Sequence, residues 1–125
     1  MSVLVTGATG LLGNNVVRLL LERGETVRCL VRKGSDRRPL RGLDVERHVA
    51  DVRDRSAVAV AVEGARLVVH AAARVGAGRR GVARYRDVNV GGTMNVARAC
   101  LEAGARMAHV STVDTIPCGT RDAPA

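Results

Sequence analysis

Val3-Leu-Val-Thr-Gly-Ala-Thr-Gly-Leu-Leu-Gly13 is the stretch that decides the fold of this 125-residue chain. Its first three residues are apolar and predict a short buried strand, and the apolar-periodic run that begins at Leu11 predicts a helix. Gly7, Gly10 and Gly13 lie between and just inside these elements. A sharp turn favours a glycine with positive φ, and a backbone without Cβ atoms can approach a pyrophosphate closely. The stretch therefore predicts a strand, a glycine turn and a helix whose first N–H groups face an anion.

The remaining sequence alternates strands and helices in the same way. We expect strands at 26–31, 45–49, 66–71 and 107–111, helices at 11–23, 55–63 and 83–103, and a polar loop or short broken helix over 33–43. Asp54 is the expected N-cap of the second helix. Alternation of this kind builds parallel β-α-β units with right-handed crossovers. The predicted fold is α/β, a Rossmann-type doubly wound parallel sheet with strand order 3-2-1-4-5.

Apolar stripes predict the buried face of each helix. In the first helix the stripe is Leu12, Val16, Leu19 and Leu20. The long helix carries its stripe at Val88, Gly92, Val96, Ala99, Cys100 and Ala103. Two glycines in mid-helix, Gly91 and Gly92, cost roughly 1 kcal/mol each relative to Ala, so we expect them to permit close packing.

Composition limits the class of protein. Hydrophobic residues make up 46% and aromatic residues 1%, so the core must be built from Val, Leu and Ala. No apolar run approaches the ~20 residues of a membrane span. The three cysteines show no C-x-x-C spacing, which indicates reduced thiols and a cytoplasmic protein, and the histidines and carboxylates form no metal-ligand pattern. The net charge of +8 comes almost entirely from scattered arginines, so it does not favour a nucleic-acid partner.

Thr6-Gly7-Ala8-Thr9-Gly10-Leu11-Leu12-Gly13 resembles the nucleotide fingerprint of the extended short-chain dehydrogenase/reductases, the NAD(P)-dependent epimerase/dehydratase family. Four later stretches resemble the same family in the same order: Asp51-Val52, His70-Ala71-Ala72-Ala73, Asn89-Val90-Gly91-Gly92-Thr93 and Val110-Ser111-Thr112. The resemblance is greatest to the dihydroflavonol-reductase-like and sugar-epimerase-like branch. It implies an oxidoreductase or epimerase that acts on a hydroxyl or carbonyl carbon of a small molecule. The alternative is an ordinary glycine-rich turn that binds nothing.

The end of the second strand bears on the choice of cofactor. Dinucleotide-binding folds often place an acidic residue there to hold the ribose 2′-hydroxyl, but this chain has Arg32 followed by Lys33. A cation at this place can pair with a 2′-phosphate, which favours NADP over NAD, with Ser35 and Arg37 as helpers. The alternative is that Arg32 is only a surface arginine at a strand end.

The resemblance also implies how the cofactor is held. Asp51 would accept a hydrogen bond from the exocyclic amine of the adenine, unless it only caps the following turn. Three alanines after His70 would let the cofactor lie flat across the strand ends, and His70 receives no proton-transfer role. The complete set of expected cofactor-binding residues is Gly7, Thr9, Gly10, Leu11, Leu12, Gly13, Arg32, Lys33, Ser35, Asp51, Val52, Ala71, Ala72 and Ala73.

For catalysis, the resemblance implies a hydroxyl at the end of the fifth strand, Thr112 or alternatively Ser111, with Asn89 in support. The family's proton donor is the Tyr of a Y-x-x-x-K motif, but Tyr85 has no Lys four positions on. We therefore expect residues 1–125 to be an incomplete NAD(P)-binding Rossmann domain, inactive alone, from a longer reductase or epimerase, and we expect that full-length parent to be a homodimer. The alternatives are a non-catalytic NADP-binding regulatory module and a nonfunctional truncated remnant.

Overall fold

The computed structural model describes residues 1–75 and 81–112. Its elements, in chain order, are β1 (Ser2–Thr6), α1 (Leu11–Glu22), β2 (Val27–Val31), η1 (Arg38–Leu40), β3 (Glu46–Val49), α2 (Arg55–Val62), β4 (Ala65–His70), α3 (Val82–Arg86), η2 (Asp87–Gly92), α4 (Thr93–Ala103) and β5 (Arg106–His109). Every predicted strand is present, with bounds that differ by at most two residues. The short 3₁₀ helix η1 interrupts the loop expected over 33–43.

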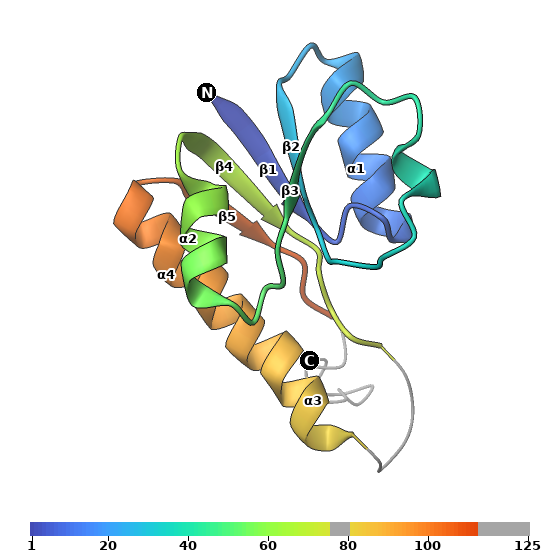
Figure 1. Cartoon of the computed structure of the whole chain (residues 1–125). Coiled ribbons are helices and arrows are strands. Elements are labelled where there is room, and N and C mark those ends of the chain that lie inside the picture. The colour runs from blue at the N-terminus through green and yellow to red at the C-terminus, as the bar shows by residue number, and fades with distance from the viewer. Residues whose placement is uncertain (76–80, 113–125) are drawn as a thin grey trace, which may run out of the picture.

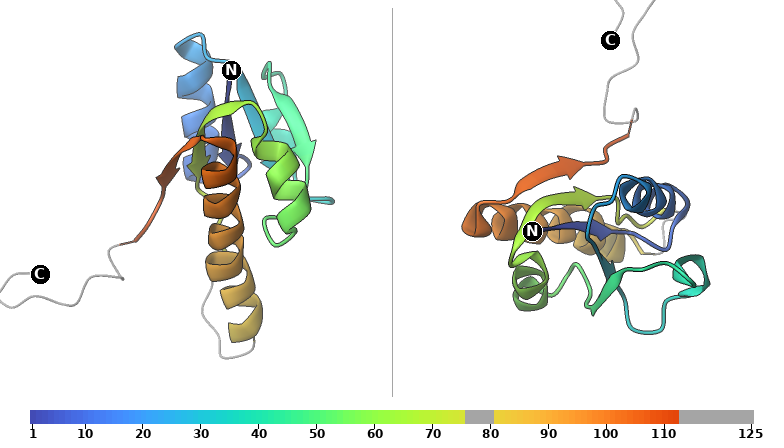
Figure 2. Two further views of the ribbon diagram at one scale, coloured as in Figure 1. Left: turned by 90° about the vertical axis from the view of Figure 1, so that its left-hand side faces the viewer. Right: turned by 90° about the horizontal axis from the view of Figure 1, so that it is seen from above.

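The five strands form one parallel sheet in the order β3-β2-β1-β4-β5, as predicted. Helix α1 covers one face of the sheet, and α2 and α4 cover the other (Figures 1 and 2). Strand order reverses beside β1, because β2 lies on one side of it and β4 on the other. In sheets of this type, ligands bind at the carboxyl ends of the strands near that reversal.

The two faces of the sheet carry separate cores of Val, Leu, Ala and Cys side chains. Val3, Val5 and Val17 are fully buried between the sheet and α1. Leu4, Val68 and Val96 are buried between the sheet and the helix pair α2 and α4. Alternate residues of β1 thus face opposite layers, and both layers are filled without aromatic side chains, as the composition predicts.

The predicted buried face of α1 is wrong in part. Leu12 and Leu19 are about half exposed, whereas Gly13 and Val17 are buried. The reason lies in the turn that precedes the helix. Gly13 must face Gly7 because their backbones touch, and this contact rotates the helix so that the leucines on the next face point outward.

The long helix predicted over 83–103 is not α-helical throughout. Helical backbone runs from Val82 to Ala103, but Asp87–Gly92 form a π-helical segment between α3 and α4. The predicted stripe holds over most of α4, where Val96, Ala99 and Cys100 are buried, but it is wrong for Ala103, which is exposed at the end of the helix. Asp54 caps α2 as expected, because its carboxylate accepts a hydrogen bond from the N–H of Ala57 at 3.0 Å.

Candidate functional site

The glycine turn between β1 and α1 is fixed by backbone contacts. Gly7 has φ +71°, and a Cβ there would lie 2.6 Å from the carbonyl carbon of Ala71 and 2.7 Å from the N of Ala72. A Cβ on Gly13 would overlap the carbonyl oxygen of Gly7. Both positions therefore require glycine for steric reasons, as the motif predicts.

Helix α1 begins directly above this turn and has no side-chain cap. Its N-cap, Gly10, has an extended backbone with φ −82°, and no side chain accepts a hydrogen bond from the first turn. The first N–H groups of a helix have no partner within the helix. An anion that approaches Gly10 would therefore meet free donors and the positive end of the helix dipole.

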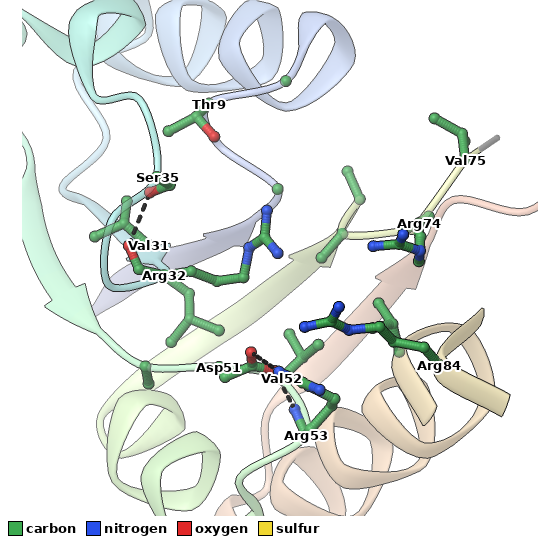
Figure 3. Close-up of a pocket in the computed structure, with 18 residues that line it drawn as sticks. Thr9, Val31, Arg32, Ser35, Asp51, Val52, Arg53, Arg74, Val75 and Arg84 are labelled. Carbon is green, nitrogen blue, oxygen red and sulfur yellow. Dashed lines mark hydrogen bonds and ion pairs between the residues drawn. The ribbon is translucent and has the colours of Figure 1, made fainter. Parts of the chain in front are cut away.

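A pocket of about 470 Å³ lies between this turn and the ends of the neighbouring strands (Figure 3). Its volume falls within the range usual for small-molecule and cofactor sites. The lining residues come from the ends of four strands and from the helix that follows β4. They are Gly7, Thr9, Gly10, Leu30, Val31, Arg32, Ser35, Ala50, Asp51, Val52, Arg53, Ala71, Ala72, Ala73, Arg74, Val75, Arg84 and Val88.

Most of the predicted cofactor residues line this one pocket. Lys33 is exposed and outside the lining, and so are Leu11 and Leu12, which are 86% and 51% exposed. The buried Gly13 is outside the lining too, and so are Ser111 and Thr112, which follow β5. The binding and catalytic roles of all the predicted residues, inside the lining or outside it, stay predictions.

Arg53 holds the carboxylate of Asp51 in a two-point ion pair. Oδ1 accepts hydrogen bonds from the backbone N–H and from Nε of Arg53, both at 2.9 Å, and Oδ2 accepts one from Nη2 at 2.8 Å. The hydrogen bond from the Arg53 side chain lowers the pKa of Asp51. An ionised carboxylate can accept about four hydrogen bonds, so about one acceptor position on Asp51 is left for a donor such as an adenine amine.

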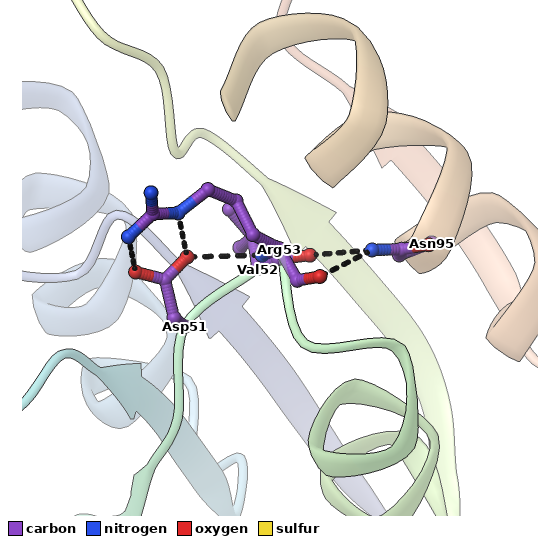
Figure 4. A network of polar contacts seen from close by, with 4 residues as sticks. All are labelled: Asp51, Val52, Arg53 and Asn95. Carbon is purple, nitrogen blue, oxygen red and sulfur yellow. Dashed lines mark hydrogen bonds and ion pairs between the residues drawn. The ribbon is translucent and has the colours of Figure 1, made fainter. Parts of the chain in front are cut away.

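The loop that carries this pair is anchored from α4 (Figure 4). Nδ2 of Asn95 donates to the carbonyl oxygens of Val52 and Arg53, at 3.0 and 3.2 Å. Gly92 lets the helix come this close, because a Cβ there would lie 2.7 Å from Cγ2 of Val52. Close packing is therefore confirmed for Gly92. A Cβ on Gly91 would meet nothing within 4 Å, so the same prediction for that glycine is wrong.

A chain of hydrogen bonds runs beneath the pocket through the buried His70. The N–H of Ala72 donates to Oγ1 of Thr6 at 3.1 Å, and this hydroxyl lies 2.7 Å from Nδ1 of His70. On the other side, Nε2 of His70 lies 3.0 Å from Oγ1 of Thr93, which donates to the carbonyl oxygen of Asn89 at 2.7 Å.

The directions of these bonds assign the tautomer of His70. The Thr93 hydroxyl gives its proton to Asn89, so it accepts from Nε2–H of the imidazole, and Nδ1 accepts from the hydroxyl of Thr6. Burial, and to a lesser degree the nearby His109, lowers the pKa of His70 to about 4. The ring is therefore neutral near pH 7 and joins β1, β4 and α4 as a structural connection.

Asn89 makes a second connection at the edge of the pocket. Its Oδ1 accepts from the N–H of Arg74 at 2.7 Å, and its Nδ2 donates to the carbonyl oxygen of the same residue at 3.0 Å. The side chain thus fixes the segment after β4 that lines the pocket. This contact is compatible with the supporting role predicted for Asn89, which stays a prediction.

Sequence reasoning missed several residues of the site. Arg53 and Arg74 line the pocket from the loops after β3 and β4, and Arg84 lines it from α3. Thr6 and Thr93 were also missed as site residues, although each belongs to a motif that the sequence makes visible. For the arginines there was no local signal, because each is one of many scattered along the chain.

A parallel sheet of this order, with a glycine turn at its reversal point and a pocket across the strand ends, defines a dinucleotide-binding Rossmann protein. Residues 3–124 match the family described as the NAD dependent epimerase/dehydratase family. The chain belongs to this family.

Sequence similarity to two proteins supports the assignment to this family. The chain is 44% identical over 117 residues to sterol demethylase protein B of Methylococcus capsulatus, a match that covers 93% of this chain and 36% of that protein. It is 36% identical over 136 residues to human 3 beta-hydroxysteroid dehydrogenase type 7, with 97% of this chain and 35% of that protein covered. The chain thus spans about a third of the length of these relatives.

A solved structure shows the same fold. The short-chain dehydrogenase/reductase superfamily protein from Agrobacterium tumefaciens, solved with bound NAD, is 31% identical and superposes with a TM-score of 0.81 over 96% of this chain and 35% of that one. In residues 1–75 and 81–112, no helix is long and apolar enough to cross a membrane.

Proposed function

We propose that this chain binds NADP(H) and forms the nucleotide-binding part of an extended short-chain reductase or dehydrogenase. The observation that carries the choice of NADP is Arg32, which follows β2 directly and lines the pocket. It makes no ion pair with any carboxylate of the described residues. A guanidinium in this position suits a 2′-phosphate, whereas an acidic residue there would suit the free 2′-hydroxyl of NAD.

Each part of the cofactor has residues that fit it. The glycine turn and the first N–H groups of α1 would hold the pyrophosphate, and Asp51 would accept from the adenine amine. Ala71, Ala72 and Ala73 would let the cofactor cross the end of β4. When bound, the nicotinamide supplies or accepts a hydride. The Tyr–Lys pair that the family uses is not among these residues, so the proposed contribution of this chain is binding and orientation.

The binding proposal is tested by titration of the purified chain with NADPH and NADH, followed by calorimetry. We expect saturable binding with NADPH preferred. Arg32→Asp should weaken NADPH binding by about a hundredfold, because a charge-assisted pair is replaced by repulsion, and NADH binding should stay the same or become tighter, because the new carboxylate can accept from the free 2′-hydroxyl. Arg41→Asp is the matched control, since Arg41 is exposed and outside the pocket. A folded chain that binds neither dinucleotide would refute the proposal.

For the whole protein we propose oxidation or reduction of a hydroxyl or carbonyl group on a lipid-like molecule. Support comes from relatives that are 34–44% identical and are named for sterol demethylation, 3 beta-hydroxysteroid dehydrogenation, ketoreduction of a farnesyl-substituted quinoline oxide and ceramide reduction. The epimerase structures that resemble this chain are less similar, at 22–28% identity. An assay of this chain joined to residues that complete its fold should show NADPH consumption with a 3-oxosteroid. Conversion of UDP-glucose instead would contradict the proposal.

A second candidate is a non-catalytic NADP-binding module. Such a module would bind NADPH in the titration above and would give no turnover in the completed protein.

A further inference from the structure

Four arginines line the pocket, whereas Asp51 is the one carboxylate among its described lining residues. Arg32, Arg53 and Arg74 follow the carboxyl ends of β2, β3 and β4, and Arg84 lies on α3. Asp51 pairs with Arg53 and neutralises it. The other three guanidinium groups form no ion pair and no side-chain hydrogen bond with residues 1–75 or 81–112. The described walls of the pocket therefore carry a surplus of three positive charges.

Outside the pocket, Arg28, Arg38, Arg55 and Arg66 each pair with a carboxylate, whereas other described arginines, such as Arg18 and Arg98, form no ion pair. What distinguishes the pocket is that three unpaired guanidinium groups line one concave site. Arginines brought together in one concave site repel one another, and an anionic ligand relieves the repulsion. A cleft lined by one sign of charge attracts ligands of the opposite sign. Arg32 alone would be enough for one contact to a 2′-phosphate. The other two unpaired arginines, Arg74 and Arg84, are therefore available to bind a ligand as well.

The position of Arg84 identifies which part of the ligand it would meet. Figure 3 shows Arg32 and Arg84 extending from opposite walls toward the middle of the pocket. Val88, one helical turn after Arg84, lines the same wall, and Gly92 packs against Val52. Arg84 thus stands on the side of the pocket formed by the loop after β3. The glycine turn, where a pyrophosphate would lie, belongs to the β1 side.

We propose that Arg84 is a second binding residue for the 2′-phosphate of NADP and closes over it from the side opposite Arg32. This inference rests on the proposed binding of NADP(H). A phosphate monoester has three terminal oxygens and up to two negative charges, so two guanidinium groups can bind it from two directions. The usual place for cofactor discrimination is the end of β2, whereas Arg84 comes from the helix after β4. Specificity for NADP would then be shared between two elements that are far apart in sequence.

The test compares two ligands of similar charge that carry their phosphates in different places. In 2′,5′-ADP one phosphate is on the 2′-oxygen, whereas in ADP both phosphates form a 5′-pyrophosphate. We would measure dissociation constants of 2′,5′-ADP, ADP, NADPH and NADH for the full chain and for Arg84→Gln, Arg84→Lys and Arg86→Gln. Arg86 lies on the same short helix, is exposed and does not line the pocket, so it is the matched control.

We expect Arg84→Gln to weaken 2′,5′-ADP and NADPH by about tenfold, the loss expected when a charge-assisted hydrogen bond is removed. ADP and NADH should bind as before, Arg84→Lys should recover part of the loss, and Arg86→Gln should have no effect. Equally weakened binding of all four ligands would overturn the inference. Arg84 would then contact the pyrophosphate or attract every anionic ligand through the overall positive potential of the pocket. Unchanged binding would also overturn it. If the unsubstituted chain binds no dinucleotide, the proposed function itself fails.

Discussion

The glycine turn and the arginine side of the pocket face the same space but are held in opposite ways. At the turn, Gly7 and Gly13 touch backbone atoms so closely that neither position has room for a Cβ. On the other side, Arg32 and Arg84 are exposed side chains without an ion pair among the described residues. The turn is therefore part of the packed structure, whereas the arginines are available to a ligand.

This difference separates two kinds of effect. A change at the turn should alter the fold and the cofactor site together, because the same backbone atoms form both. A change at the arginines should alter which anion binds and leave the stability of the fold nearly constant. The following predictions test this separation.

The largest expected effect is that of Gly13→Ala. The new Cβ would overlap the carbonyl oxygen of Gly7, so either the turn or α1 must move. Overpacking of this kind should lower the free energy of unfolding by about 3 kcal/mol, and Tm by more than about 10 °C.

Gly10→Ala is the control for that variant. A Cβ on Gly10 would lie 3.4 Å from the same oxygen, and the backbone there, with φ −82°, suits any residue. Its Tm should change by less than the equivalent of about 1 kcal/mol. Similar losses in the two variants would show that the turn does not depend on the steric contact.

The second effect concerns pH and the buried His70, which contacts Thr6 before the glycine turn and Thr93 at the start of α4. Its pKa is about 4 in the folded protein and near 6.5 in the unfolded chain, so between these values the unfolded chain binds more protons. Stability should therefore fall as pH decreases from 7 toward 4, by about 2 kcal/mol at pH 5. Denaturant unfolding at a series of pH values measures this. In His70→Gln, the loss over this interval should disappear, and its persistence would assign it to other groups.

The third prediction compares neighbouring glycines on the arginine side. Gly92→Ala should destabilise the fold by about 1 kcal/mol, because its Cβ would press on Val52 and the better helix propensity of Ala offsets only part of the strain. Gly91→Ala meets nothing within 4 Å and should be neutral or stabilising by up to about 1 kcal/mol. Thermal unfolding of both variants checks this, and the reverse order would contradict the packing.

The smallest effect on stability is expected from the arginines. Arg84→Gln and Arg32→Gln should change the free energy of unfolding by less than about 0.5 kcal/mol, as is usual for exposed side chains without special contacts. Urea unfolding would measure this alongside the binding constants. A larger loss in either variant would show that the charged side also contributes to the fold, which would end the distinction between the two sides.

The sequence predicted the fold well because its signals are local. Strands of apolar residues, a glycine turn and the Asp54 cap each depend on a few neighbouring positions. The rotation of α1 was not predictable in this way, since it follows from contact between Gly13 and Gly7 across the turn. The π-helical segment was missed for a similar reason, because 3.6-residue periodicity describes the stripe on α4 well and gives no sign of an extra residue before it.

In the candidate site, the residues at the strand ends could be predicted from the sequence, but the arginines that lie beside them could not. Asp51 and the three alanines were found through their resemblance to the family's motifs, and they stand where a parallel sheet presents its carboxyl ends. The pairing of Arg53 with Asp51, and the approach of Arg84 from α3, depend on how side chains from separate elements meet. In a chain with so many arginines, no spacing distinguishes those that line a pocket from those on the outer surface.

The π-helical segment Asp87–Gly92 changes the direction in which side chains before it point, relative to the side chains after it. One additional residue in a helix advances every side chain before it by about 100° relative to those after it. In α4 the apolar stripe faces the sheet, while the side chains of α3 can point in a different direction around the helix axis. An uninterrupted α-helix with the same stripe would turn Arg84 by about a quarter of a revolution. The extra residue thus sets the orientation of the α3 side chains independently of those of α4. One continuous helix can therefore pack apolar side chains against the sheet through α4 and present the charged Arg84 to the pocket from α3.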